Sequence, residues 1–169
     1  TTSTFNSGLT ATAPSGLVIA GNLTTTTLAS GLILGDANTD LSFTDTANLT
    51  TNNGTVTLSA STLGTGVTLG VNSGLGAISL DQIANGKSAT GTLLQLAGGA
   101  LTATGSLDVD ALSLSNSSAT FSSVVGATIA PVLTVLAPST GIIAFSGPST
   151  NLASGSQFNS GNYGLQFDS

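Results

Sequence analysis

The sequence predicts an all-β fold, namely an antiparallel β-sandwich or jelly roll with an extended N-terminal strand. Leu, Val, Ile, Thr and Phe recur in short runs that are bounded by Gly, Asn, Ser or Pro, which is typical of strands joined by turns. The runs follow one another at roughly 8–12 residues, the spacing of a sandwich. Helical periodicity is nearly absent, because Gly and β-branched residues interrupt almost every apolar stretch.

A β-solenoid is the alternative, and one local repeat favours it. The tripeptides "VTL" (56–58), "VTL" (67–69) and "ISL" (78–80) follow one another at a constant interval. A second pair, "ATGTLLQL" (89–96) and "ATGSLDV" (103–109), is offset by a longer interval. A solenoid stacks the same positions on each successive coil and therefore needs a persistent period. Because the interval changes and is then lost, the sandwich is favoured.

We expect two parts, an N-terminal strand or arm over residues 1–16 and a single β-rich domain over residues 17–169. The length of 169 residues fits one ordinary domain and leaves little room for a second. The strands expected in the domain are 17–20, 23–28, 32–35, 41–44, 55–59, 67–71, 77–80, 92–97, 100–104, 106–114, 119–125, 132–136, 141–146 and 163–167.

The N-terminal arm is the candidate for self-assembly. Phe5, Leu9, Ala11 and Ala13 alternate with more polar residues, and Pro14 ends the run. Such a strand has one apolar-leaning face. It can pair within its own sheet, or it can enter the sheet of a neighbouring subunit as a donor strand. In the second case these four apolar residues would make the contact between subunits.

The phrase "FNSG" occurs near both ends, at 5–8 and at 158–161, with a looser copy, "VNSG", at 71–74. We interpret each end copy as an aromatic anchor followed by a glycine turn, the first positioning an outgoing strand and the last a closing hairpin. At the C-terminus, "QFNSGNYGLQFDS" (157–169) predicts a β-hairpin, because a turn-forming run separates two short apolar segments.

Composition excludes several classes of function. Only 5% of the residues are charged, and the one cation, Lys87, cannot form the basic cluster that nucleic acids require. No apolar run approaches the roughly 20 residues that span a bilayer, so no membrane insertion is expected. His, Cys, Met, Trp and Glu are absent, which removes thiol and imidazole chemistry. We therefore expect no enzyme.

Calcium is the only cofactor that the sequence suggests. Asp36, Asn38 and Asp40 stand at alternate positions, like the first oxygen ligands of a calcium loop. An EF-hand is excluded, because Leu41 and Ala47 occupy the positions of its Gly and its bidentate Glu. The alternative is an Asx-turn between strands, in which short polar side chains bond their own backbone.

Two further patterns concern the surface. In "SLDVDALSLS", Leu107 and Val109 lie on one face of a half-buried strand and Asp108 and Asp110 on the other; without a titratable partner, these carboxylates predict no catalysis. Candidate N-glycosylation sequons begin at Asn22, Asn48, Asn53 and Asn116.

The chain resembles exported microbial surface proteins that build sheaths, filaments or adhesive layers. The resemblance lies in the Ser, Thr, Gly, Ala and Leu content of segments such as "GALTATGSLDVDALSLSNSSATF" (99–121), in the absence of Cys and in the near-absence of Lys and Arg. Filament subunits joined by donor strands are similar in having one β-rich domain and a terminal extension. Autotransporter passengers and filamentous-haemagglutinin-like adhesins are similar in the repeated "VTL"-type strands.

The resemblance implies a non-enzymatic structural subunit of an extracellular filament, pilus-like fibre or surface layer. The expected partner is a second copy of the chain, joined by β-strand contacts, and the expected location is the cell surface or the extracellular space. The start at Thr1 without Met fits removal of an export signal. The alternative function is a cell-surface adhesin or binding module that recognises carbohydrate or another surface.

Overall fold

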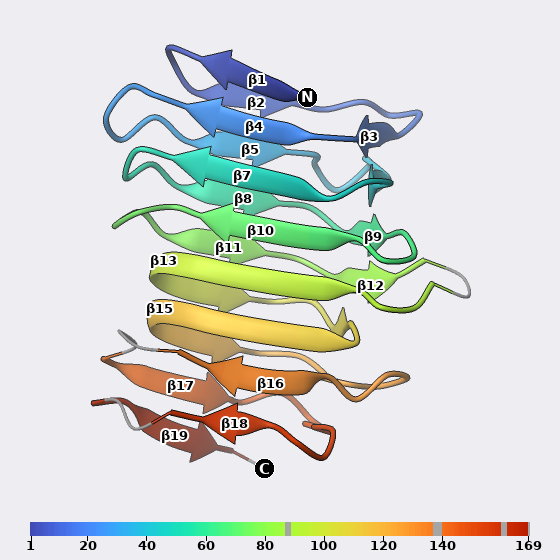
Figure 1. The fold of residues 1–169 in the computed structure, drawn as a ribbon, viewed down its shortest axis with the longest axis vertical. Helices are drawn as coiled ribbons and strands as arrows, with labels where there is room; N and C mark the ends of the chain where they lie inside the picture. The colour runs from blue at the N-terminus through green and yellow to red at the C-terminus, as the bar shows by residue number, and fades with distance from the viewer. Residues whose placement is uncertain (87–88, 137–139, 160–161, 169) are drawn as a thin grey trace.

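The chain folds into a β-solenoid, not into the predicted antiparallel sandwich. The structure is a computed structural model and describes residues 1–86, 89–136, 140–159 and 162–168. Every strand pair of these residues is parallel, and the chain winds through about seven turns (Figure 1). The prediction of an antiparallel sandwich is therefore wrong, and the alternative that the local repeat favoured is the fold. Each connection carries the chain around the stack, so neighbouring strands come from successive coils.

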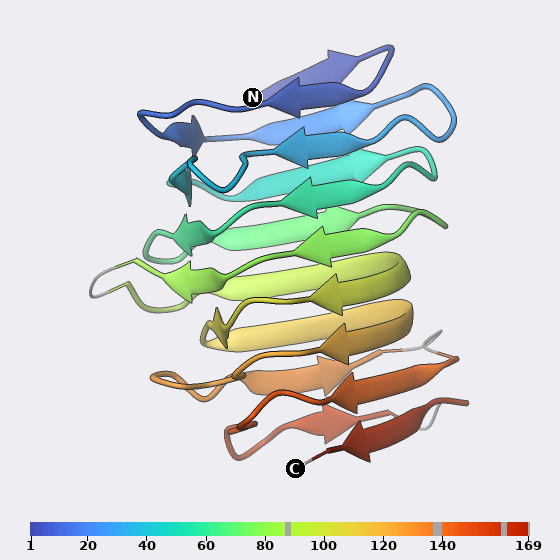
Figure 2. The same ribbon diagram turned by 180° about the vertical axis from the view of Figure 1, so that it is seen from behind.

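Three walls enclose the core (Figures 1 and 2). Wall 1 contains β1 (Thr2–Phe5), β4 (Asn22–Thr25), β7 (Ala47–Thr51), β10 (Thr68–Asn72), β16 (Val132–Val135) and β18 (Gln157–Phe158). Wall 2 contains β2 (Leu9–Ala11), β5 (Leu32–Leu34), β8 (Val56–Leu58), β11 (Ile78–Leu80), β17 (Ile142–Phe145) and β19 (Gly164–Phe167). Wall 3 contains β3 (Leu17–Ile19), β6 (Leu41–Phe43), β9 (Ser61–Leu63), β12 (Ile83–Asn85) and β14 (Leu107–Asp108). Two long strands, β13 (Leu93–Ala103) and β15 (Ala111–Phe121), bend around the corner and serve both walls 1 and 2.

The core is made of apolar rows that run along the solenoid axis. Within a strand such as β5, Leu32 and Leu34 point inward and are buried while Ile33 points to solvent, because side chains alternate between the two faces of a sheet. Parallel register then stacks equivalent positions of successive coils. We define row A of wall 2 by its residues Ala11, Leu34, Leu58, Leu80, Ala103, Phe121, Phe145 and Phe167. Burying each Leu- or Phe-sized member contributes about 1.5–3 kcal/mol.

The length of a coil varies, which hides the repeat in the sequence. The coil from Leu93 to its wall 1 partner Ala111 is short, whereas the coil from Leu23 to its partner Leu49 is much longer. The constant interval between the three tripeptides is half a coil, because "VTL" 56–58 pairs with "ISL" 78–80 in wall 2. The intervening "VTL" 67–69 lies across the core, at the start of β10 in wall 1.

The "NSG" phrase forms the corner between walls 1 and 2. At 71–74, the backbone N–H of Gly74 donates to the Asn72 side chain (3.0 Å) and the buried Ser73 hydroxyl donates to the Gly76 carbonyl (2.5 Å). Gly74 has a φ of 61°, and a Cβ there would collide with the Asn53 Oδ1 atom of the previous coil. The copy at 5–8 joins β1 to β2 at the same corner. Phe158 of the last copy ends β18, and residues 160–161 lie outside the described residues.

Both termini lie within the walls of the chain itself. β1 pairs with β4 and β2 with β5, so residues 2–11 extend the stack as its first coil. At the other end β18 pairs with β16 and β19 with β17, all in parallel. The predicted C-terminal hairpin is therefore wrong, because the two segments turn a corner of the solenoid and lie in different walls.

Candidate functional site

The N-terminal end coil holds all four residues predicted for self-assembly. Leu9 and Ala11 point inward from β2 and pack, half-buried, against the core. Phe5, at the end of β1, is also half-buried. Ala13 lies beyond β2, where its backbone N–H donates to the buried Thr39 hydroxyl of the next coil (3.3 Å). Three of the four residues therefore belong to the strands that form the end of the stack.

The C-terminal end coil exposes apolar side chains at inward-facing positions. Leu165 is 41% exposed and Phe167 56% exposed in β19, and Phe158 of β18 is 41% exposed. The corresponding residues of the preceding coil, such as Phe145, are almost completely buried. Phe121, Phe145 and Phe167 form a stack with ring centroids 4.9 and 5.1 Å apart. In the last described coil, side chains at core positions are therefore partly exposed, because no further coil covers them there.

The edges of both end coils are open in the described part of the chain. β1 and β2 each pair on one side only, as do β18 and β19 (Figure 1). Soluble proteins usually guard such edges with charged residues or Pro within the strands. None of the four end strands contains a charged residue or a Pro. These edges are suited to pairing with another strand.

The acidic loop at 36–40 lies at a corner between walls 2 and 3, and Asp36 forms an Asx-turn there. Its Oδ1 atom accepts hydrogen bonds from the Asn38 backbone N–H and the Thr39 hydroxyl, each at 2.9 Å. These bonds, the Asn38 bond first, hold the pKa of Asp36 below its ordinary value. No group of three or more His, Cys, Asp or Glu side chains comes together among the described residues. The calcium site at Asp36, Asn38 and Asp40 stays a prediction.

Asp108 and Asp110 do not converge on a common site. The Asp108 carboxylate accepts the backbone N–H groups of Thr128 (2.8 Å) and Ile129 (3.1 Å). The Asp110 carboxylate instead accepts hydrogen bonds from Thr92 and Asn85. Each carboxylate thus forms hydrogen bonds that link its own corner to a neighbouring coil. Leu107 and Val109 are buried as predicted.

Asp110 makes the stability of the chain depend on pH. Partial burial raises its pKa, but the bonds from the Thr92 N–H and hydroxyl (both 2.9 Å) and from Asn85 Nδ2 (3.1 Å) outweigh this, so the pKa lies below 3.8. A depressed folded-state pKa stabilises the protein above the unfolded value, and this contribution is lost as pH falls through the folded value. We expect Asp110→Asn to lower stability by about 1 kcal/mol at pH 7. The melting temperatures of the two proteins should begin to converge as pH falls below 3.8, and they should meet only below the lower folded-state pKa of Asp110. A difference in melting temperature between the wild type and Asp110→Asn that stays constant down to pH 2.5 would contradict this role.

The four sequon residues lie in different environments. Asn48 is exposed, and Asn22 and Asn53 are half-buried. The Asn22 side chain accepts the Asn48 backbone N–H (2.8 Å), which links two coils of wall 1. Asn116 is only 2% exposed and donates to the Gly99 carbonyl (3.2 Å). A glycan on Asn116 would need this corner of the coil to open.

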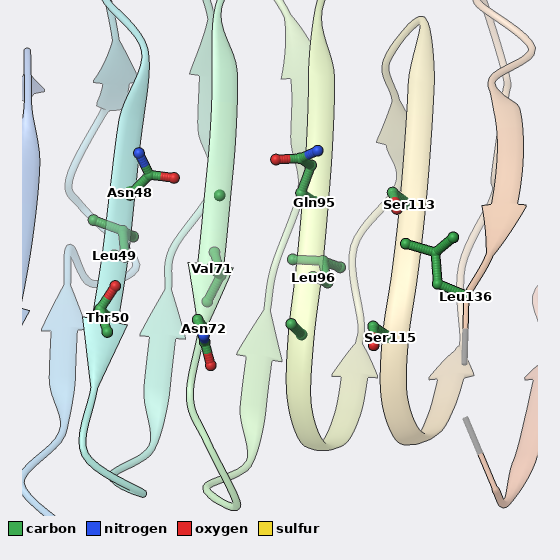
Figure 3. Close-up of a pocket in the computed structure, with 12 residues that line it drawn as sticks. Asn48, Leu49, Thr50, Val71, Asn72, Gln95, Leu96, Ser113, Ser115 and Leu136 are labelled. Atoms are coloured by element: carbon green, nitrogen blue, oxygen red, sulfur yellow. The ribbon is translucent and has the colours of Figure 1, made fainter. Parts of the chain in front are cut away.

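A shallow groove of about 250 Å³ crosses the outer face of wall 1. It is lined by residues of the neighbouring strands β7, β10, β13 and β15 and by Leu136, which follows β16. Asn48, Gln95 and Ser113 lie in one row, and Thr50 and Asn72 lie in the next (Figure 3). Gly70, in the first row, has no side chain, and Ala97, in the second row, has only a methyl group. The surface is therefore hollow at these two positions. The lining residues are uncharged amides, hydroxyls and small or apolar groups. Such a surface offers hydrogen bonds to another uncharged polar surface.

Sequence reasoning noted that Phe158 and Phe167 gather near the C-terminus, but it did not place them at an open edge, and it did not find the groove. The spacing of Phe121, Phe145 and Phe167 was a signal for the edge, because these residues recur at close to one coil length. The groove left no signal, since its residues come from strands that only the register brings together.

The comparisons with known proteins give no match, so the function has to be inferred from the geometry of the chain. The described residues contain no helix long and apolar enough to cross a membrane. No protein-family model matches the chain, and no curated protein or solved structure matches it at a significant level.

Proposed function

We propose that the protein is a non-enzymatic structural subunit of an extracellular filament, pilus-like fibre or surface layer, and that it polymerises through β-strand contacts between subunits. The observation that carries this proposal is the pair of end coils in the described part of the chain. Their edge strands β1, β2, β18 and β19 are open and uncharged, and the C-terminal coil presents core-type side chains to the outside. Residues 2–11 lie in the walls of their own chain. The contact we propose is therefore the addition of whole coils.

A polar, weakly charged exterior suits such a role. The outer faces of the walls carry many Thr, Ser, Asn and Gln side chains beside exposed apolar ones such as Val18 and Ile33. The whole chain has seven Asp and one Lys. With so few charges, little electrostatic repulsion opposes the close approach of copies. Chains with almost no Lys or Arg also offer few cleavage points to trypsin-like proteases, which suits a location outside the cell.

The second candidate function is a binding module or adhesin, and the groove of wall 1 favours it. Its amide and hydroxyl groups are able to bond the hydroxyl groups of a carbohydrate. If this is the function, Gln95→Ala should weaken retention on a polysaccharide column while leaving the melting temperature within about 2–4 °C of wild type.

Negative-stain microscopy and size-exclusion chromatography of the purified chain separate the two functions. A structural subunit should form long, regular fibres or sheets whose amount rises with protein concentration. A monomer that stays monomeric at high concentration and binds a carbohydrate would overturn the proposal in favour of the binding module.

A further inference from the structure

We infer that the partner at each end coil is a second copy of this chain, stacked head to tail, so that β2 of one copy pairs in parallel with β19 of the next. This inference rests on the proposed function and specifies its junction. In the register of the existing coils, Leu165, Gln166 and Phe167 would lie opposite Leu9, Thr10 and Ala11 of the added copy. Wall 1 would place Phe158 opposite Ser3.

A hydrogen bond that recurs along row A shows which backbone groups would meet. In each coil, the residue after the row A member donates its N–H to the carbonyl of the row A member one coil earlier. The described chain contains seven such bonds, from Gly35 to Ala11 at one end through Asp168 to Phe145 at the other, all between 2.8 and 3.0 Å. At the last coil the Phe167 carbonyl faces the open edge. The Thr12 N–H of a second copy occupies the position of the next donor.

The side chains of the two ends are complementary in size. Phe167 projects from the last coil, and its counterpart on the first coil is the small Ala11. The same combination is already packed inside the chain, where Ala103 lies beside Phe121 and both are buried. In wall 1, Phe158 would meet the equally small Ser3. The two Phe rings of one end thus face small side chains at the other.

The two ends fit each other better than either fits itself. Two C-terminal ends would bring the exposed rings of Phe158 and Phe167 against the same rings of the partner. Two N-terminal ends would leave Ser3 and Ala11 facing small residues. The only charged side chain near the junction is Asp168, because residues 1–21 contain none. A contact between unlike ends repeats without closing and produces a filament.

A disulfide at the junction tests this register, since the chain has no cysteine of its own. Thr10 and Gln166 are exposed and point outward, so cysteines at these positions should leave the fold intact. We expect the double variant Thr10→Cys/Gln166→Cys to form covalent ladders on a non-reducing gel after mild oxidation, because in-register strands bring Cα atoms within disulfide range. Mixing the two single variants should give covalent heterodimers.

The control is Ser79→Cys/Gln166→Cys, in which the first cysteine lies in the same outward row but in the middle of the stack. It should form no ladder. Homodimers of either single variant in excess of heterodimers would overturn the head-to-tail arrangement. Fibres of the double variant without any ladder would also overturn it, while the proposed function would stand with another contact. If the wild-type chain forms neither fibres nor sheets, the proposed function itself fails.

Discussion

Phe121→Ala is expected to lower the free energy of unfolding by about 3–5 kcal/mol, because it removes a ring from the middle of row A and leaves a cavity. Phe121 is 1% exposed and stacks on Phe145 with centroids 4.9 Å apart. Urea unfolding followed by circular dichroism measures this change. A monomeric background is needed, so that assembly does not add to the apparent stability.

Phe167→Ala is the matched control, since it deletes the same ring from the exposed end of the same row. Phe167 is 56% exposed, so its loss should cost the isolated chain about 1 kcal/mol or less. If both substitutions destabilise the chain equally, Phe121 is not enclosed by coils on both sides and the stacked core is wrong.

Leu165→Lys is expected to abolish fibre formation without unfolding the chain. In the free subunit Leu165 is 41% exposed at the open edge, so the lysine can extend into solvent. Stacking a second copy would enclose its ammonium group between apolar side chains, and the penalty for burying an unpaired charge is several kcal/mol at each junction. Sedimentation and negative-stain microscopy measure the loss of fibres.

The control for Leu165→Lys is Leu75→Lys. Leu75 is 84% exposed at a corner of a middle coil, so this variant adds the same charge away from either end. It should assemble like the wild type. Normal fibres from the Leu165→Lys variant would show that β19 is not at the junction between subunits.

The all-β class and the alternation within strands could be predicted from the sequence. In "VTL" (56–58), Val56 and Leu58 are buried and Thr57 lies on the other face, as the alternation of apolar and polar residues indicates. The same alternation occurs in parallel and antiparallel sheets, so it could not decide how the strands pair. Only a persistent period would have indicated stacked coils.

Corner loops of unequal length removed that period. Between the strands of the second coil, residues 26–31 and 35–40 make long corners, whereas the third coil uses only residues 52–55 and 59–60. Insertions at corners leave the walls in register, because each wall pairs with the coils beside it and not with the loops. The solenoid therefore tolerates unequal spacing between equivalent positions, as the pairs Leu93 with Ala111 and Leu23 with Leu49 show.

The candidate site could be predicted in part. The alternation of Phe5, Leu9 and Ala11 predicted one extended N-terminal strand that contacts a neighbouring subunit. The single strand is wrong, because a corner divides it into β1 and β2, which both lie at the end of the stack. The contact with a neighbouring subunit stays a prediction. The facing surface at Leu165 and Phe167 was not recognised, because the recurrence of Phe121, Phe145 and Phe167 marks it only once the length of a coil is known. Only the strand order shows that they lie in the last coil of the described chain.

X-ray diffraction from aligned fibres tests the account most directly. In a head-to-tail stack of solenoids the strands run across the fibre, and neighbouring strands repeat along its axis at about 4.7–4.9 Å. We expect a strong reflection at this spacing on the meridian of the wild-type fibres. The Leu165→Lys variant should give no such pattern, because it should form no fibres. A reflection of the same spacing on the equator would mean that the solenoids associate side by side, and it would contradict assembly through the end coils.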